Sequence, residues 1–341
     1  MPPIRAPGEQ AKGLAAAVTA YSLWGLFPAY WKLLSQVPAY EMLAHRIVWS
    51  AALLVALALA RGRLGGLVAV LRDRRRLAAL AASASLITVN FFVFIWAVTH
   101  GRVTEVSLGY YINPILNVLL GFLVLRERMT RLQAVAVALA TLGVVNLAVA
   151  QGAAPWVSLA LAFAFGLYGL VRKLAPVEAQ TGLSVEMLLL TAPALTFLVL
   201  FREPAMGALT TGGLGQGILV LASGPVTATP LFLFAMGARQ LPLGVLGMLQ
   251  YLAPTLQLAL AVLAYGEPFT PAHGLTFACS WIAMVLYVRE AWRLGRVNAA
   301  AQRHGRPIPP SPGPPGPGGP PGSSPGTPFP AQSKALDQSR S

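Results

Sequence analysis

Two stretches of the chain decide the fold: LGYYINPILNVLLGFLVLRERMT at 108–130 and MLQYLAPTLQLALAVLAYGEPFT at 248–270. Leucine and alanine align easily by chance, so the argument depends on the other matched residues. In one unbroken register these are Tyr111 with Tyr251, Pro114 with Pro254, Glu127 with Glu267, and Thr130 with Thr270. The offset is constant, which indicates that the chain contains an internal duplication.

The composition indicates that much of the surface faces lipid. Of the 341 residues, 56% are hydrophobic and 11% are charged, and the mean hydropathy is +0.64. A soluble domain carries about 25% charged residues. Less than half that fraction cannot cover a protein of this size with a wetted surface. A soluble globular enzyme is therefore excluded, and the lipid bilayer is the expected solvent.

About ten apolar runs have the length of a membrane-spanning helix, which needs roughly 20 residues. They lie near 13–34, 40–60, 77–99, 104–125, 131–150, 155–173, 182–201, 213–236, 242–265 and 271–292. The strands of a membrane barrel would alternate in polarity, and these runs do not. We therefore predict an all-α integral membrane protein.

The basic residues predict the orientation of these spans. Cytoplasmic loops are enriched in Lys and Arg. With the N-terminus inside, 21 basic residues fall on the inner side, and only Lys32, Arg102 and Arg202 fall on the outer side. We expect both termini in the cytoplasm, which requires an even number of spans. The net charge of +14 then reflects topology, and nucleic acid is not an expected partner.

Five spans in each half make the second half enter the membrane with the opposite orientation. We predict a first half at 1–151, a second, inverted half at 152–293 and a disordered Pro/Gly-rich cytoplasmic tail at 294–341. Inverted repeats are the architecture of alternating-access transporters, whose site lies near the midplane between the repeats.

Prolines inside the fourth and ninth spans predict a substrate cavity. Proline frees the carbonyl one turn earlier, and in hydrocarbon that carbonyl needs a partner or a water-lined space. The alternative is a packing kink, with nearby amides joining helices. The cavity candidates are Asn90, Tyr110, Tyr111, Asn113, Pro114, Asn117, Gln250, Tyr251, Pro254 and Gln257.

Ionisable residues inside spans are costly and mark functional paths. The candidates for gating or coupling are Lys32, Glu41, His45, Arg46 and Glu186. Glu41 and His45 are four residues apart, so they share a helical face, and histidine titrates near neutral pH. Proton coupling through this pair is one reading. An interfacial cap with snorkelling Arg46 and Lys32 is the other.

Glu127 and Glu267 precede Thr130 and Thr270, which are good helix N-caps. We expect these four residues to have structural roles in turns, because the inverted topology places the two carboxylates on opposite membrane faces. Paired acid–base catalysis is therefore excluded.

No enzyme or metal signature is present in the sequence. One cysteine and four scattered histidines form no metal-binding pattern, and no P-loop, nucleophile elbow or HExxH occurs. We predict no cofactor and no catalytic residue, and without a P-loop any pumping would need an ion gradient or a partner. The expected partners are a small-molecule substrate and the bilayer, and a homodimer is left open. The alternatives are a membrane-embedded enzyme and a signalling or scaffold protein.

Longer motifs resemble a known family. They are YSLWGLFPAYWKLL at 21–34, VPAYEMLAHRIVWS at 37–50, FIWAV at 94–98, EVSLGYYINPILNVLLG at 105–121, YGLVRK at 168–173, VEAQTG at 177–182, QYLAPTL at 250–256 and YGE at 265–267. The chain resembles the EamA family of the drug/metabolite transporter superfamily from about Ala11 to Glu290, without the tail. The resemblance implies ten helices in two inverted halves in the bacterial inner membrane. It also implies transport of small metabolites or drug-like compounds, with a link to chloramphenicol sensitivity.

Overall fold

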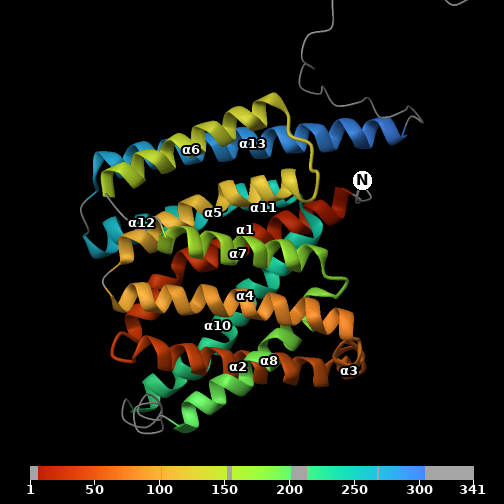
Figure 1. Cartoon of the computed structure of the whole chain (residues 1–341), viewed down its shortest axis with the longest axis vertical. Helices are drawn as coiled ribbons and strands as arrows, with labels where there is room; N and C mark the ends of the chain where they lie inside the picture. The colour runs from red at the N-terminus through yellow and green to blue at the C-terminus, as the bar shows by residue number, and fades with distance from the viewer. Residues whose placement is uncertain (1–6, 101, 152–155, 201–212, 267–268, 304–341) are drawn as a thin grey trace, which may run out of the picture. The chain divides into compact units, whose positions relative to one another are not determined.

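The computed structural model consists of helices (Figure 1) and describes residues 7–100, 102–151, 156–200, 213–266 and 269–303, which contain no strand. In chain order the helices are α1 (Pro7–Leu33), α2 (Ala39–Ala60), α3 (Leu64–Arg72), α4 (Arg74–Thr99), α5 (Val103–Leu123), α6 (Arg131–Gln151), α7 (Trp156–Leu174), α8 (Ala179–Leu200), α10 (Gly213–Gln240), α11 (Leu243–Leu249), α12 (Leu252–Tyr265) and α13 (Pro271–Arg303). All of them belong to the unit Met1–Ile308.

Nine stretches among the described residues are long and apolar enough to cross a membrane, with α11 and α12 together forming one of them. Helix α1 is not among the nine, but its 27 residues span about 40 Å at 1.5 Å per residue, which exceeds the hydrocarbon thickness. The prediction of an all-α membrane protein with roughly ten helices is therefore confirmed.

A short amphipathic helix, α3, lies between the second and third predicted spans. Its buried residues are Leu67 and Val70. They pack in a cluster with Leu80 of α4 and with Val177 and Val185 near the start of α8. This cluster joins the two halves at the end of the bundle where α1 begins.

The start of the tail requires a correction. Helix α13 continues to Arg303, ten residues into the segment 294–341 that we predicted as tail. The sequence NAAAQR at 298–303 consists mainly of strong helix formers, and the first following proline is Pro307. Alanine, glutamine and arginine extend a helix at little cost, and proline ends it. Residues 304–341 lie outside the described residues.

The helices pack in the pattern that a twofold relation between the halves requires. Three pairs matched by the repeat contact each other: α2 with α8, α5 with α11, and α6 with α13. The contacts of α1 with α10 and α12 are matched by those of α7 with α4 and α5. Helix α5 ends near the start of α1, whereas α12 ends at the opposite end of the bundle (Figure 1). The halves therefore interlock.

Glycines let helices from the two halves approach closely. A Cβ built on Gly224 of α10 would lie 2.6 Å from the Trp49 carbonyl carbon in α2, and one on Gly247 of α11 would lie 2.9 Å from the Pro114 carbonyl oxygen in α5. The Ser50 hydroxyl donates a hydrogen bond of 3.0 Å to the Gly224 carbonyl. Small residues at such crossings are typical of helix packing in membranes.

We predict that Gly224→Ala destabilises the protein, because the added methyl group would meet the backbone of α2. Overpacking of this kind costs about 1–3 kcal/mol, measured as a lower melting temperature of the detergent-solubilised protein. Gly215→Ala is the matched control on the same helix, since nothing lies within 4 Å of its built Cβ. Equal melting temperatures for the two variants would contradict the close α2–α10 contact.

Candidate functional site

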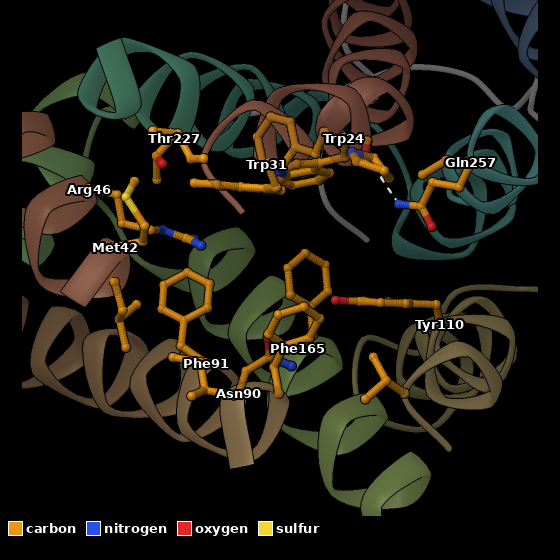
Figure 2. A pocket seen from close by; sticks show the side chains of 18 of the residues that line it. Trp24, Trp31, Met42, Arg46, Asn90, Phe91, Tyr110, Phe165, Thr227 and Gln257 are labelled. Carbon is orange, nitrogen blue, oxygen red and sulfur yellow. Dashed lines mark hydrogen bonds between the residues drawn. The ribbon is translucent and has the colours of Figure 1, made fainter. Parts of the chain in front are cut away.

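A cavity of about 800 Å³ lies among α1, α2, α4, α5, α7, α10 and α12 (Figure 2). At one end its lining includes the α1–α2 connection, where Ser35 and Gln36 are exposed. At the other end it reaches Tyr21, Thr227 and Gln250, which are buried. The cavity therefore enters the bundle from the end where α1 finishes and stops partway through it. We call that entrance the open end.

Eight aromatic residues contribute to the cavity wall. They come from several helices: Tyr21, Trp24, Phe27, Trp31, Phe91, Phe94, Tyr110 and Phe165. Beneath the inner rings, Tyr168 and Phe234 stack with an interplanar angle of 14°, and Phe234 also contacts Trp24 and Phe165. These rings therefore pack behind Trp24 and Phe165 of the lining.

Arg46 of α2 is the one charged side chain among the described residues that line the cavity. Its guanidinium carbon lies 4.1 Å from the Phe91 ring centre and 5.8 Å from the Trp31 ring centre. These distances fit cation–π contacts. Figure 2 shows the guanidinium pointing into the cavity between the two rings.

Five of the ten predicted cavity residues are in the lining: Asn90, Tyr110, Gln250, Pro254 and Gln257. The Asn90 amide nitrogen donates to the Leu161 carbonyl at 3.1 Å, and the Gln257 amide nitrogen donates to the Trp24 carbonyl at 3.2 Å (Figure 2). Because these bonds use the amide nitrogens, the carbonyl oxygens of both side chains are left to accept bonds from a ligand.

The other five predicted residues lie outside the lining: Tyr111, Asn113, Pro114, Asn117 and Tyr251. The close contact of α5 with α11 at Gly247 covers Pro114 and Asn117, and the Tyr251 hydroxyl donates to the Tyr111 carbonyl at 3.2 Å. The Asn117 amide nitrogen donates to Asn113 at 2.8 Å and to Gln250 at 3.3 Å. These amides therefore join helices behind the cavity.

The proline pair differs between the two halves. Pro114 lies inside the continuous helix α5. Its counterpart Pro254 lies in the first turn of α12, after the chain leaves α11 at Gln250 and Tyr251. The first-turn N–H groups have no partner within a helix, so Pro254 costs little there. The break brings Gln250 into the lining.

Hydrogen bonds and ion pairs close the end of the bundle where α1 begins, which we call the closed end. The α7–α8 connection, residues 175–178, is fastened by Arg239, which donates to the Val177 carbonyl. Lys173 donates to the Leu241 carbonyl. Arg172 contacts Glu186 at 3.2 Å, and both side chains are almost fully buried. The described cavity lining includes no residue of this connection.

The comparisons with known proteins agree with this architecture. The EamA-like transporter family matches residues 11–149. An uncharacterized transporter of Pseudomonas aeruginosa is 45% identical over 83% of this chain and 95% of its own length. The protein RarD of Streptomyces exfoliatus is 40% identical over 87% of this chain and 94% of its own length.

This chain belongs to the EamA-like transporter family.

More distant comparisons extend across the same region. The chloramphenicol-sensitive protein RarD of Pseudomonas aeruginosa is 33% identical over 84% of this chain and 97% of that relative. A protein of known crystal structure, 22% identical, shares the fold with a TM-score of 0.66 over 82% of this chain and 99% of its own. The family and the names of its members indicate a membrane transporter.

The gating candidates of this EamA protein take different positions. Arg46 lines the cavity, and Glu186 pairs with Arg172 at the closed end. Glu41 and His45 lie 3.7 Å apart and are buried, outside the lining. The Lys32 ammonium sits 3.5 Å from the Tyr265 ring centre, so it joins α1 to α12. Coupling through Glu41 and His45 stays a prediction.

The predicted turn residues connect helices. Glu127 accepts bonds from the backbone N–H groups of Leu243 and Gly244 at 2.7 and 3.2 Å, at the start of α11. The Thr130 hydroxyl accepts from the Gln133 N–H at 3.2 Å, and the Thr270 hydroxyl accepts from the His273 N–H at 3.3 Å. Such bonds pair N–H groups that a helix start leaves open. Glu267 lies outside the described residues.

Sequence reasoning missed several cavity residues, mainly aromatic ones: Tyr21, Trp24, Trp31, Phe91, Phe165 and Thr227. One signal was available. The bulky residues of α1 recur three, four and three positions apart at Tyr21, Trp24, Pro28 and Trp31, and this spacing places them on one helical face. For Phe91, Phe165 and Thr227 no comparable pattern exists in the sequence.

We predict that Arg172→Met lowers the free energy of unfolding by about 3–5 kcal/mol, because it leaves the Glu186 carboxylate buried without its cation. The double variant Arg172→Met/Glu186→Leu should recover part of this loss. Thermal unfolding of the detergent-solubilised protein measures both.

The matched control is Arg63→Ala, which breaks the Arg63–Glu178 pair. This pair is 2.7 Å long, and both side chains are at least half exposed. Exposed pairs contribute about 0–1 kcal/mol, so this variant should melt near the wild type. A double variant less stable than Arg172→Met would contradict the assigned pairing.

Proposed function

We propose that this EamA protein is a secondary permease that moves small organic molecules across the membrane by alternating access between its two inverted halves. The observation that carries the proposal is the cavity, which enters from one end and does not reach the fastened connection at the other. Its volume lies within the range of small-molecule sites, about 300–1,000 Å³. Because the sequence offers no P-loop, any uphill transport would be driven by an ion gradient or by a partner.

Two equivalent connections have different conformations, and this supports the alternating mechanism. The α1–α2 connection forms the cavity mouth, with Ser35 and Gln36 exposed. Its repeat counterpart, the α7–α8 connection, is held to α10 by Arg239, and Val177 is buried. If the halves exchanged these conformations, the cavity would open at the opposite end, as inverted repeats allow.

We further propose that the open end faces the outside of a bacterial inner membrane. Helix α1 begins and α13 ends at the closed end (Figure 1), and a Cβ built on Gly295 would lie 3.6 Å from the Gln10 side chain. The predicted inner-side basic residues, including Arg172, Lys173 and Arg239, belong to that end. Their excess supports cytoplasmic termini.

Cysteine accessibility tests the two-state mechanism without requiring a substrate. In a Cys279→Ser background of the purified protein in lipid nanodiscs, where both faces are accessible, a water-soluble maleimide should modify Gln36→Cys quickly and Val177→Cys slowly. Adding Arg239→Ala should raise the rate at Val177→Cys roughly tenfold, because it removes a hydrogen bond that holds the connection.

Arg74→Ala is the control, because Arg74 is exposed at the same end and leaves the connection intact. Fast modification of Val177→Cys in the unaltered background would count against a closed end. An unchanged rate after Arg239→Ala would show that Arg239 does not hold the connection.

We also predict that Gln250→Ala lowers flux roughly tenfold, because it removes a polar group from the inner end of the cavity. Proteoliposomes loaded with chloramphenicol, amino acids or related metabolites, with and without a pH gradient, measure the flux.

Asn146→Ala is the control, because its amide joins α6 to α13 at 3.1 Å, away from the cavity. It should lower the melting temperature but retain flux per folded protein, and wild-type flux in Gln250→Ala would remove Gln250 from the site.

A further inference from the structure

The side chain of Arg46 is positioned to bind a negatively charged group. It lies within a span, on α2, and lines the cavity. Its Nε atom is buried and has no hydrogen-bond partner among the described residues. An isolated charge within the membrane is costly unless a partner or water compensates it. Arg46 is therefore a cation that no ion pair among the described residues neutralises.

The groups around Arg46 explain its orientation but do not neutralise it. Phe91 and Trp31 flank the guanidinium, and the hydroxyl of Tyr110 points into the same space (Figure 2). The nearest carboxylate along α2, that of Glu41, lies 3.7 Å from His45, and no ion pair joins Glu41 to Arg46 among the described residues. The aromatic contacts fix the planar group with its donors facing the cavity.

We propose that the cavity binds organic anions that carry a carboxylate on a flat apolar body, with the carboxylate paired to Arg46. This deepens the proposed function and rests on it. A guanidinium presents its donors in a fork that matches the two oxygens of a carboxylate. The Tyr110 hydroxyl can donate a further bond to the same group.

The rest of the cavity selects the body of this anion. In the same lining, the rings of Trp24 and Phe165 contact each other and form an apolar wall. This wall favours stacking of an aromatic ligand. Asn90 and Gln257 each offer an amide oxygen at the wall, because their nitrogens are bound to backbone carbonyls. A cationic ligand would meet Arg46 without a counter-charge, so we expect the cavity to reject amines.

A charge series of one ligand tests the proposal on the purified full-length protein in lipid nanodiscs. The probes are 3-phenylpropionate, its neutral amide and 3-phenylpropylamine, and binding is read from the fluorescence of the protein, since Trp24 and Trp31 line the cavity. We expect the carboxylate to bind about tenfold more tightly than the amide, and the amine to bind least. Equal binding of carboxylate and amide, or no binding of the carboxylate at millimolar concentration, would overturn the proposal.

Variants assign the preference to Arg46. Arg46→Gln should bind carboxylate and amide equally, and Arg46→Lys should keep part of the preference because the charge remains. Arg102→Gln is the control, since Arg102 pairs with Glu105 outside the lining. A carboxylate preference that survives Arg46→Gln would refute the assigned role. If Arg46→Gln does not fold, Arg46→Lys and the charge series on the wild type still decide the question.

The result is separable from the test of alternating access. Cysteine accessibility at the two ends depends on the connections and not on ligand charge. A protein that shows the predicted accessibility but no anion preference would keep the proposed mechanism and lose this substrate class. A protein that prefers the carboxylate but never opens its closed end would keep this substrate class and lose the proposed mechanism.

Discussion

The contact between α5 and α11 is the constraint from which the site follows. In hydrocarbon every backbone polar group needs a partner within the protein, so the spans are helices. Helices of the two halves pack closely where a small residue on one lets the backbone of the other approach. Gly247 does this against Pro114 and Asn117, and the repeat partners Tyr111 and Tyr251 meet beside it, with the Tyr251 hydroxyl donating to the Tyr111 carbonyl at 3.2 Å. This contact buries the amides of α5 and leaves Gln250 at the inner end of the cavity.

The sequence predicted features that are local or periodic. Span positions follow from runs of apolar residues, and the twofold pairing of helices follows from the register of Pro114 and Pro254. The sequence could not predict whether a residue lines the cavity or is buried between helices, because this depends on how closely two helices distant in the sequence approach each other. The sequence placed Asn113 and Asn117 in the cavity, whereas Asn117 lies against Gly247 of α11 and Asn113 is buried beside it, accepting its hydrogen bond. Trp24 and Trp31 lie on a stripe that was readable in the sequence.

The repeat is symmetric in sequence but not in local structure. Helix α5 is continuous, whereas its counterpart is divided into α11 and α12. The α1–α2 connection is open, and the α7–α8 connection is fastened. The charge is asymmetric too, because the match of Glu41 with Glu186 places Thr191 opposite Arg46. The proposed mechanism and the proposed anion site both arise from these differences between equivalent segments.

The basic residues at the closed end have a consequence for how this chain is made. Lys173 and Arg239 belong to the charge excess that directs membrane insertion in the proposed orientation. In the folded protein the same side chains bind the carbonyls of Leu241 and Val177. The same two side chains therefore contribute both to the orientation of the chain in the membrane and to the stability of the closed end. A substitution at Lys173 or Arg239 would remove an inner-side positive charge and a hydrogen bond of the closed end at the same time.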